Sequence, residues 1–368
     1  MDRSTVSANI VKCMFLGSTD KVVVAGNAPR TTVQILYPPS DITKTDSSDE
    51  YLHPVTEYVS PGQCMDFELC GIGRLAKTFG AVSTWDEHKA MSTVSLLDLD
   101  TNIDTASIHM SVSELYTDNS AITSLSFSSE LELLAIGTEA GLVGIIDIHS
   151  GNSLCTLKAD PCGVSVIKFM RNGGLMTAGE SPRSQIKLWD LRGSGAGDGK
   201  AVMTQKQAMA DGTGKKHRSR TTCIAAHPVE EKLLSGNSDG TVQLWDLRSA
   251  ASMAFRPFLD NSAVTDILVH PRRLNTALCS ASSGVVRGFD TSSAPTDSTA
   301  TTTGIDHEND ADVDMDSYNG DTGLAQEGYF PAVCREGASV NCLDCDNGSD
   351  SCVLLAGTSA GGVVRAFI

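Results

Sequence analysis

The chain alternates between short apolar runs and clusters of Gly, Ser, Asn and Asp, and this alternation repeats along most of its length. In each clear copy, an apolar run is followed by a turn cluster and then by a run of alternating apolar and polar residues, which is the signature of a β-hairpin. A further short run of strand character precedes each hairpin. The hairpins lie at 133–151, 175–193, 233–249, 277–292 and 354–368, and the preceding runs at 121–128, 164–170, 221–228, 264–271 and 339–346. The pattern therefore predicts an all-β chain built from repeated units.

Two looser copies, within 21–38 and 74–100, bring the number of units to seven. The compact units recur at roughly the 40–45 residue period of a WD-type repeat. Two of them end in KLWDLR (187–192) and QLWDLR (243–248), which resemble the endings of WD repeats. The chain is thus similar to the WD-repeat family. This resemblance implies a seven-bladed WD-repeat β-propeller that occupies residues 1–368 as a single domain.

The resemblance also assigns structural roles to Trp189, Asp239 and Trp245. No unit carries the Gly-His pair that usually opens a WD repeat, whereas Asp239 and Trp245 occupy the positions of two other members of the usual buried polar network. In a WD repeat the Trp-Asp pair closes the third strand of a blade, and residues 362–368 would be such a third strand. We expect residues 3–9 to supply the missing fourth strand, so that an N-terminal strand closes the ring and leaves no open sheet edge.

Two long insertions interrupt the repeats. Residues 194–220 form a Gly-rich and basic loop insertion, and residues 291–335 form an acidic insertion rich in Ser and Thr. Residues 291–334 contain nine Asp or Glu and no Lys or Arg, so they hold about half of the formal net charge of −17. Such a stretch lacks the apolar content to fold, and we expect it to be disordered.

Composition narrows the classes of function. A chain of net charge −17 lacks the basic face that phosphates need, which argues against direct binding of nucleic acid. The eleven Cys are an odd number at scattered spacings, which favours a reducing compartment over a secreted disulfide framework. We see no signal peptide and no apolar window long enough for membrane insertion.

The motifs that suggest catalysis have simpler interpretations. Ser359 lies in a Gly-x-Ser-x-Gly pattern, but a nucleophile elbow needs a following helix, and this segment aligns with the turns of the sister hairpins. The glycine-rich residues 193–200 lack the full phosphate-loop pattern and are interpreted as a flexible linker. The protein is therefore predicted not to be an enzyme.

The candidate metal sites are equally weak. Cys342 and Cys345 are three residues apart on a strand, so their side chains point to opposite faces. The acidic residues 312–323 lack the Gly and Glu of a calcium loop, and His227 and His270 each precede a proline, as turn residues do. We expect no metal and no cofactor.

Two segments, FMRNGGLMTAGESPRSQIKLWDLR (169–192) and SVNCLDCDNGSDSCVLLAGTSAGGVVRAFI (339–368), resemble small WD-repeat nucleoporins of the Y-shaped outer-ring subcomplex of the nuclear pore. The most specific element is Ser-Val-Asn-x-Leu-Asp at 339–344. The resemblance implies a structural component of the nuclear pore complex at the nuclear envelope. Such a component binds a helical scaffold nucleoporin and supports nucleocytoplasmic transport of protein and mRNA.

An alternative of another class rests on the two WD-x-Arg endings. They resemble the box by which substrate receptors of cullin-type ubiquitin ligases bind their adaptor, and arginine suits bidentate recognition of carboxylates. On this hypothesis the partner-binding residues are Asp190, Arg192, Asp246 and Arg248. The simpler interpretation is that each arginine makes a local ion pair with the aspartate of its own strand.

Overall fold

The computed structural model describes residues 9–16, 21–27, 30–37, 53–72, 77–100, 109–128, 130–171, 173–181, 185–191, 201–206, 219–248, 251–257, 262–291, 329–330, 338–346, 353–361 and 363–367. These residues form strands and turns, and the strands assemble into antiparallel sheets. The prediction of an all-β chain is confirmed. Within the described ranges, no helical segment has the length and apolar character needed to cross a membrane.

The strands of the described residues form seven sheets, here numbered one to seven in chain order. Sheet one contains β1 (Asn9–Phe15), β2 (Val22–Asn27), β3 (Thr31–Tyr37) and β4 (His53–Ser60), and sheet two contains β5 (Gln63–Ile72), β6 (Lys77–Asp86), β7 (Met91–Asp100) and β8 (His109–Asp118). Sheet three contains β9 (Ile122–Ser128), β10 (Leu133–Thr138), β11 (Leu142–Asp147) and β12 (Ser153–Lys158), and sheet four contains β13 (Val164–Phe169), β14 (Gly174–Gly179), β15 (Gln185–Asp190) and β16 (Ala201–Lys206). Sheet five contains β17 (Thr221–Ala226), β18 (Lys232–Asn237), β19 (Thr241–Asp246) and β20 (Ala251–Pro257). Sheet six contains β21 (Val264–Val269), β22 (Thr276–Ala281), β23 (Val286–Asp290) and β24 (Tyr329–Phe330), and sheet seven contains β25 (Val340–Asp346), β26 (Val353–Thr358) and β27 (Val363–Phe367).

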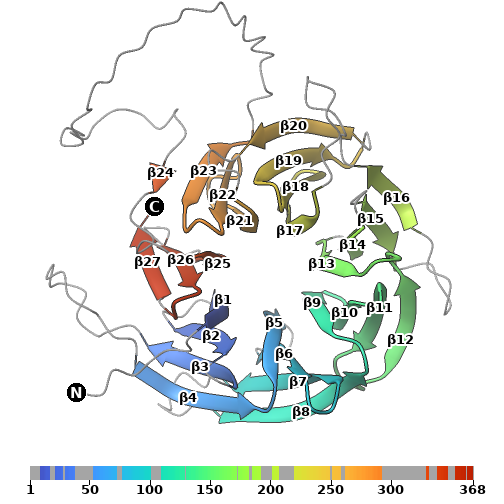
Figure 1. Ribbon diagram of the computed structural model, residues 1–368, viewed down its shortest axis with the longest axis vertical. Coiled ribbons are helices and arrows are strands. Elements are labelled where there is room, and N and C mark those ends of the chain that lie inside the picture. Colours follow the sequence, from blue (N-terminus) through green and yellow to red (C-terminus); the bar gives the residue numbers. More distant parts are fainter. Residues whose placement is uncertain are drawn as a thin grey trace, which may run out of the picture.

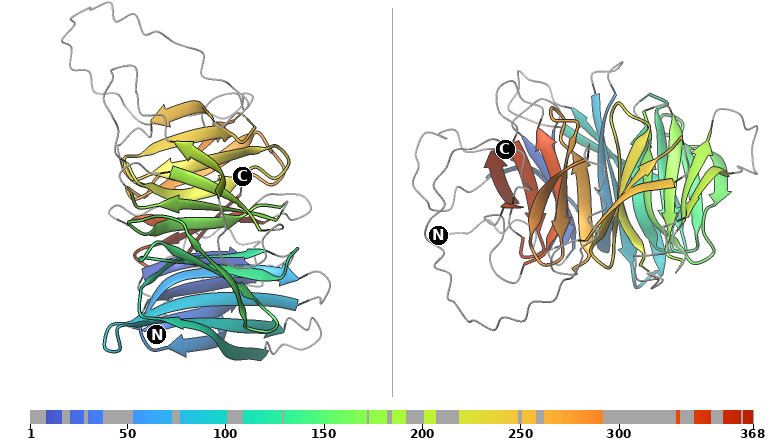
Figure 2. Two further views of the ribbon diagram at one scale, coloured as in Figure 1. Left: turned by 90° about the vertical axis from the view of Figure 1, so that its right-hand side faces the viewer. Right: turned by 90° about the horizontal axis from the view of Figure 1, so that it is seen from above.

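The sheets are arranged around a central axis, and the first strand of each sheet lies nearest to that axis (Figure 1). We call these first strands the inner strands. Seen from the side, the strands run between two faces on which the turns lie (Figure 2). We call the face on which the inner strands end the front face, and it carries the turns 170–173, 227–231 and 270–275. The opposite face, on which the inner strands begin, is called the back face.

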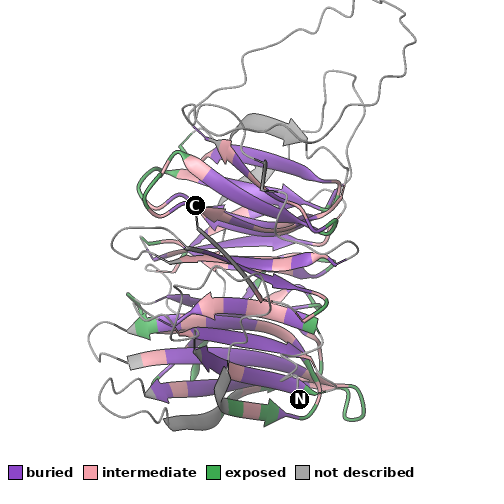
Figure 3. Ribbon diagram, turned by 90° about the vertical axis from the view of Figure 1, so that its left-hand side faces the viewer, coloured by how far each residue is buried: buried purple, intermediate pink, exposed green. Residues whose placement is uncertain are grey.

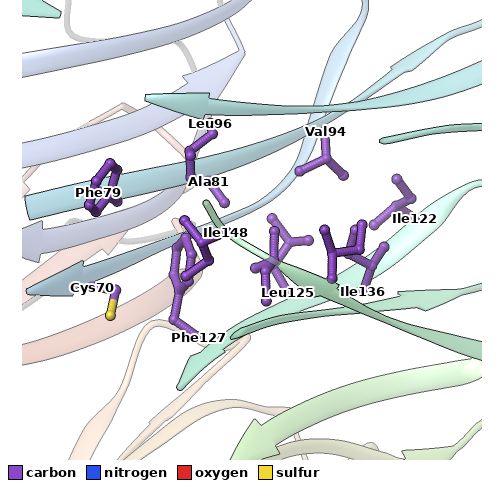
Figure 4. Packing of buried hydrophobic residues seen from close by; sticks show 12 residues of the cluster. Cys70, Phe79, Ala81, Val94, Leu96, Ile122, Leu125, Phe127, Ile136 and Ile148 are labelled. Atoms are coloured by element: carbon purple, nitrogen blue, oxygen red, sulfur yellow. The ribbon is translucent and has the colours of Figure 1, made fainter. Parts of the chain in front are cut away.

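Seven clusters of buried apolar side chains hold the sheets together, and each cluster lies between two neighbouring sheets. Figure 4 shows the cluster between sheets two and three, where Phe79 and Leu96 face Leu125 and Phe127. One cluster joins sheet seven to sheet one, through Leu355 among others. Buried residues follow most of the strands and exposed residues mainly occupy the turns (Figure 3).

Side chains of the inner strands bond to the backbone of the next sheet. Asp66 Oδ2 accepts the N–H of Leu125 at 2.7 Å, and Asp266 Oδ2 accepts the N–H of Leu343 at 3.0 Å. Ser124 Oγ and Ser126 Oγ accept the N–H groups of the next inner strand in the same way, at 3.1 and 3.0 Å. Polar inner-strand residues, which are buried or half-buried, therefore join neighbouring sheets.

The structure corrects two expectations about the insertions. Residues 201–206, expected within a loop, form β16, which pairs with β15 from Gln185 to Trp189. Tyr329 and Phe330, expected within the acidic insertion, form β24 and pair with β23. These two strands are the fourth strands of their sheets. They could not be recognised from the sequence, because the residues around them have the composition of loops.

The expected closing strand lies outside the described residues, apart from Asn9. Asn9 opens β1 and pairs with Asn27 of β2, so it belongs to sheet one. The described part of sheet seven has the strand order β25-β26-β27. Closure by residues 3–8 stays a prediction.

Candidate partner-binding surface

The two tryptophans of the WD endings are core residues. Trp189 and Trp245 are 4% and 1% exposed, and each packs in a cluster between neighbouring sheets. The indole Nε1–H of Trp189 donates to Thr177 Oγ1 at 3.0 Å, and that of Trp245 donates to Ser235 Oγ at 2.8 Å. Each bond crosses from the third strand of a sheet to its second strand, so both residues stabilise the hairpin that carries the adjacent aspartate.

Asp239 lies at the opposite end of the β18–β19 hairpin from Trp245. Its Oδ1 accepts the hydroxyl of Thr241 at 2.6 Å and the N–H of the same residue at 3.1 Å. Asn237 donates to the same threonine hydroxyl at 2.8 Å. Asp239 therefore shapes a turn of the back face, and Trp245 anchors the other end of the hairpin.

Asp246 and Arg248 form a local turn on the front face. Asp246 Oδ1 accepts the backbone N–H of Arg248 at 2.8 Å and lies 3.5 Å from its Nε. The Arg248 side chain is 67% exposed. The carboxylate thus fixes the turn, while most of the arginine stays accessible to solvent.

In the corresponding turn of sheet three, Asp147 occupies the position of Asp246, and histidine replaces the arginine. Asp147 Oδ1 accepts the N–H groups of His149 at 3.0 Å and Ser150 at 2.7 Å. The N–H of Ser150 helps to hold the pKa of Asp147 below its usual value. Since the same turn forms with histidine in place of arginine, Asp246 has a structural role, and Arg248 is the residue available to a partner.

The first WD-x-Arg ending is only partly described. Asp190 ends β15 and is exposed. Arg192 lies outside the described residues, so its role in partner binding stays a prediction. The two strand ends belong to the neighbouring sheets four and five.

Ser359 has a structural partner that explains its position. Its Oγ accepts the N–H of Ser339 at 3.1 Å, and its own N–H donates to Ser339 O at 3.0 Å. Ser238 makes the same two bonds with Arg220, at 3.0 and 2.8 Å. Ser359 is therefore a turn residue equivalent to that of a sister hairpin, as the alignment predicted.

The histidine and cysteine predictions also agree with the structure. His227 Nδ1 accepts the N–H of Glu230 at 2.8 Å, and His270 Nδ1 accepts that of Arg273 at 3.0 Å, so both rings stabilise turns. Cys342 is fully buried against Cys13, with 3.3 Å between the two Sγ atoms, whereas Cys345 is partly exposed. Among the described residues, no three His, Cys, Asp or Glu side chains are grouped as metal ligands. The phosphate-loop-like and calcium-loop-like segments lie outside the described ranges.

A charged central cavity is the feature that the sequence did not predict. A cavity of about 760 Å³ lies along the inner strands and reaches the front face, where Arg171, Val229 and Pro271 line it. Within it, Lys168 Nζ lies 2.7 Å from Glu68 Oε1, and Lys12 Nζ lies 3.6 Å from Asp266 Oδ2. These ion pairs join residues of four different sheets.

The cavity shifts the pKa values of its charged groups. Glu68 raises the pKa of Lys168, and Asp266 raises that of Lys12 well above its ordinary value, because each carboxylate favours the protonated amine. Burial raises the pKa of Asp66 to about 6, since the ionised carboxylate loses hydration there. In the sequence, this cavity is indicated only by charged residues within strands that are otherwise mostly apolar, such as Lys12 in β1.

The Ser-Val-Asn-x-Leu-Asp segment joins sheet seven to sheet one. Asn341 Nδ2 donates to Ile10 O at 2.7 Å, and Asp344 Oδ2 accepts the N–H of Phe15 at 2.7 Å. Between them, Cys342 Sγ accepts the N–H of Cys13 at 3.1 Å. The motif that carries the strongest sequence resemblance is therefore a contact between the last and the first sheet.

Comparisons with known proteins agree with this architecture. The family model of the N-terminal domain of nucleolar protein 10-like proteins matches residues 154–328. This domain is a β-propeller. Over these residues, which are somewhat less than half of its length, the chain is similar to β-propeller proteins of the WD-repeat type.

Individual relatives match over part of the chain. A DDB1- and CUL4-associated factor 11 homolog of Caenorhabditis elegans is 25% identical over 37% of this chain and 23% of its own length. Telomerase Cajal body protein 1 of Mus musculus is 25% identical over 36% of this chain and 23% of its own length. A ribosome biogenesis protein WDR12 homolog of Chlamydomonas reinhardtii is 28% identical over 28% of this chain and 21% of its own length. The chain spans about a quarter of the length of these relatives, whose names describe different processes.

Proposed function

We propose that this propeller is a non-enzymatic structural component of the nuclear pore complex, within the Y-shaped outer-ring subcomplex. In this role it binds a helical scaffold nucleoporin and supports nucleocytoplasmic transport of protein and mRNA. The observation that carries the proposal is the segment 339–344, whose sequence resembles that of small WD-repeat nucleoporins. Three of its residues bond to β1, so the motif is tied to a specific contact. The names of two relatives refer to ribosome biogenesis and to Cajal bodies, which favours a nuclear location.

The proposal includes a single seven-bladed ring over residues 1–368, closed by a strand from residues 3–8. In support, one of the apolar clusters joins sheet seven to sheet one. A chain that lacks residues 1–8 should unfold at a lower urea concentration than the full chain, because the outer edge of β27 loses its partner. An unchanged unfolding midpoint would refute this closure.

The pore proposal is tested by the location of a fluorescent fusion of the full chain in interphase cells. The expected result is a punctate signal at the nuclear rim, with scaffold nucleoporins recovered by affinity purification. A signal spread evenly through the nucleoplasm, without nucleoporins in the purification, would refute the proposal.

A substrate receptor of a cullin-type ubiquitin ligase is the second candidate. Two observations favour it: the similarity to a DDB1- and CUL4-associated factor 11 homolog, and the exposed guanidinium of Arg248 beside Asp246. Asp190 and Arg192 would supply the equivalent box in sheet four. The double variant Arg192→Ala, Arg248→Ala should then lose the ligase adaptor in a pull-down and keep its location at the nuclear rim. Adaptor binding at full strength in a folded double variant would eliminate this candidate.

A further inference from the structure

The front face carries exposed arginines in the turns beside the central cavity: Arg171 lines the opening, and Arg272 and Arg273 directly follow Pro271, which lines it. Arg171 lies in the turn after β13, and Arg272 and Arg273 lie in the turn after β21. All three are exposed, and none of them has an ion-pair partner among the residues that the structure describes. Three exposed arginines on neighbouring front-face turns, without ion-pair partners in the described ranges, form a local positive charge on a chain of net charge −17.

An exposed apolar residue lies between these arginines. Val229, in the turn after β17, is 71% exposed, the highest value among the large apolar residues described. Pro228 and Pro271 line the same opening. We call Arg171, Pro228, Val229, Pro271, Arg272 and Arg273 together the arginine rim.

Bonds between turns hold the rim in place. His227 Nε2 contacts Leu274 O at 2.9 Å, which joins the turn of sheet five to that of sheet six. His270 Nδ1 accepts the N–H groups of Arg272 and Arg273 at 3.1 and 3.0 Å, which fixes the backbone that carries both arginines. Burial and the two arginines lower the pKa of His270, which favours the neutral ring whose Nδ1 accepts these N–H groups.

The nearby carboxylates do not neutralise the rim. Glu230 Oε2 lies 2.5 Å from Lys232 Nζ, and Asp246 bonds to Arg248. Glu230 and Glu231 are both exposed and line the opening, so Glu231 places one negative charge without such a partner beside the three arginines. The rim therefore presents three available guanidinium groups around a small apolar centre.

We propose that the arginine rim binds an acidic segment of a partner protein that carries an apolar residue among its carboxylates. Arginine forms planar, bidentate contacts with carboxylates, and it is enriched where binding energy concentrates in interfaces. The apolar residue of the partner covers Val229 and the two prolines. Nucleic acid fits less well, because its affinity depends on many phosphate contacts and the rim offers only three guanidinium groups. The inference does not depend on the proposed function, since the rim excludes both WD-x-Arg boxes.

Fluorescence anisotropy on the full chain tests the inference, with a short fluorescein-labelled peptide rich in Asp and Glu and with leucine at its centre as the probe. The double variant Arg272→Glu, Arg273→Glu should weaken binding at least about tenfold, because two charge-assisted contacts become repulsive. The matched control is Lys89→Glu, Lys158→Glu, which makes the same change of net charge on the back face and should leave the affinity within about twofold. Both control residues are exposed.

Further variants separate the possible outcomes. Arg272→Gln, Arg273→Gln removes the charges without reversing them and should also weaken binding, as should Val229→Asp. Equal weakening by the front-face and back-face pairs, or no binding of the peptide to the wild-type chain, would overturn the inference. Tighter binding of a single-stranded oligonucleotide than of the peptide would also overturn it. Replacement of residues 294–328 by a Gly/Ser linker should leave the affinity unchanged, and a marked gain would assign the rim to the acidic segment of this chain instead.

Discussion

The contact between the last and first sheets can be tested through Asn341. Its Nδ2 donates to Ile10 O across the contact at 2.7 Å, and its Oδ1 accepts the hydroxyl of Ser339 at 2.8 Å. A second Nδ2 contact, to Asn9 Oδ1 at 3.1 Å, is exposed and contributes little. The substitution Asn341→Ala removes all three bonds and leaves the strand position intact.

The expected loss follows from these bonds. A neutral hydrogen bond in a partly buried site contributes about 1 kcal/mol, so the two inner bonds together contribute about 2 kcal/mol to the free energy of unfolding. A domain of this size has a urea dependence of about 3 kcal/mol per M, so the unfolding midpoint should fall by about 0.7 M.

Urea unfolding followed by tryptophan fluorescence is the appropriate assay. The buried indoles of Trp189 and Trp245 lie in sheets four and five, away from Asn341, so they report whether the whole structure loses stability. The control is Ser165→Ala, because the Ser165 hydroxyl donates to Ala178 O at 3.0 Å within its own sheet. An Asn341→Ala midpoint equal to that of the wild type, or no lower than that of the control, would refute the argument that the contact between the last and first sheets limits stability.

Three further predictions follow from other sites. Arg248→Ala should change the free energy of unfolding by less than about 0.5 kcal/mol, because the exposed ion pair contributes little, and urea unfolding measures it. The folded state holds the proton of Asp66 up to about pH 6, so wild-type stability should fall as pH rises from about 4 to about 6. Asp66→Asn should flatten this part of the curve of midpoint against pH, and an equally steep fall in both chains would contradict the assignment. Gly141→Ala should cost at least about 2 kcal/mol, because Gly141 has φ +79° and an added Cβ would overlap Asp160 O, whereas Gly144→Ala, with open space around the added Cβ, should change stability by less than about 0.5 kcal/mol. Similar thermal midpoints for the two glycine variants would show that the backbone adapts.

The hairpins could be predicted from the sequence because their signal is local. Alternation of apolar and polar residues around Gly, Ser, Asn or Asp specifies two paired strands within about twenty residues, as 233–249 illustrates. The inner strands β1 and β5 were harder to predict, since Lys12, Asp66 and Glu68 interrupt their apolar pattern. These charges are tolerated because partners from other sheets meet them in the cavity, and such contacts are separated by many residues in the chain.

The candidate surface was predictable only in part. The WD-x-Arg ending gave the position of Arg248 on a turn, and the structure added that its aspartate partner fixes that turn. The arginine rim could not be predicted, because Arg171 and Arg272 are about one hundred residues apart in the chain. Only the arrangement of the sheets places the turns after His227 and His270 beside one another.

The hydrogen bonds between inner strands run in one direction around the axis. The two flanks of a sheet therefore differ, and a flank of one kind fits a flank of the other. Several sheets offer acceptor side chains on one flank and backbone N–H groups on the other, as Asp66 and Leu125 do, and the contact from Asp344 to Phe15 has the same direction. Interfaces of this head-to-tail kind can continue from one molecule to the next when a rotation does not close. A fragment that lacks one sheet would therefore expose two complementary flanks, and copies of it could join end to end into oligomers. Truncation of this chain is therefore expected to cause self-association as well as a loss of stability.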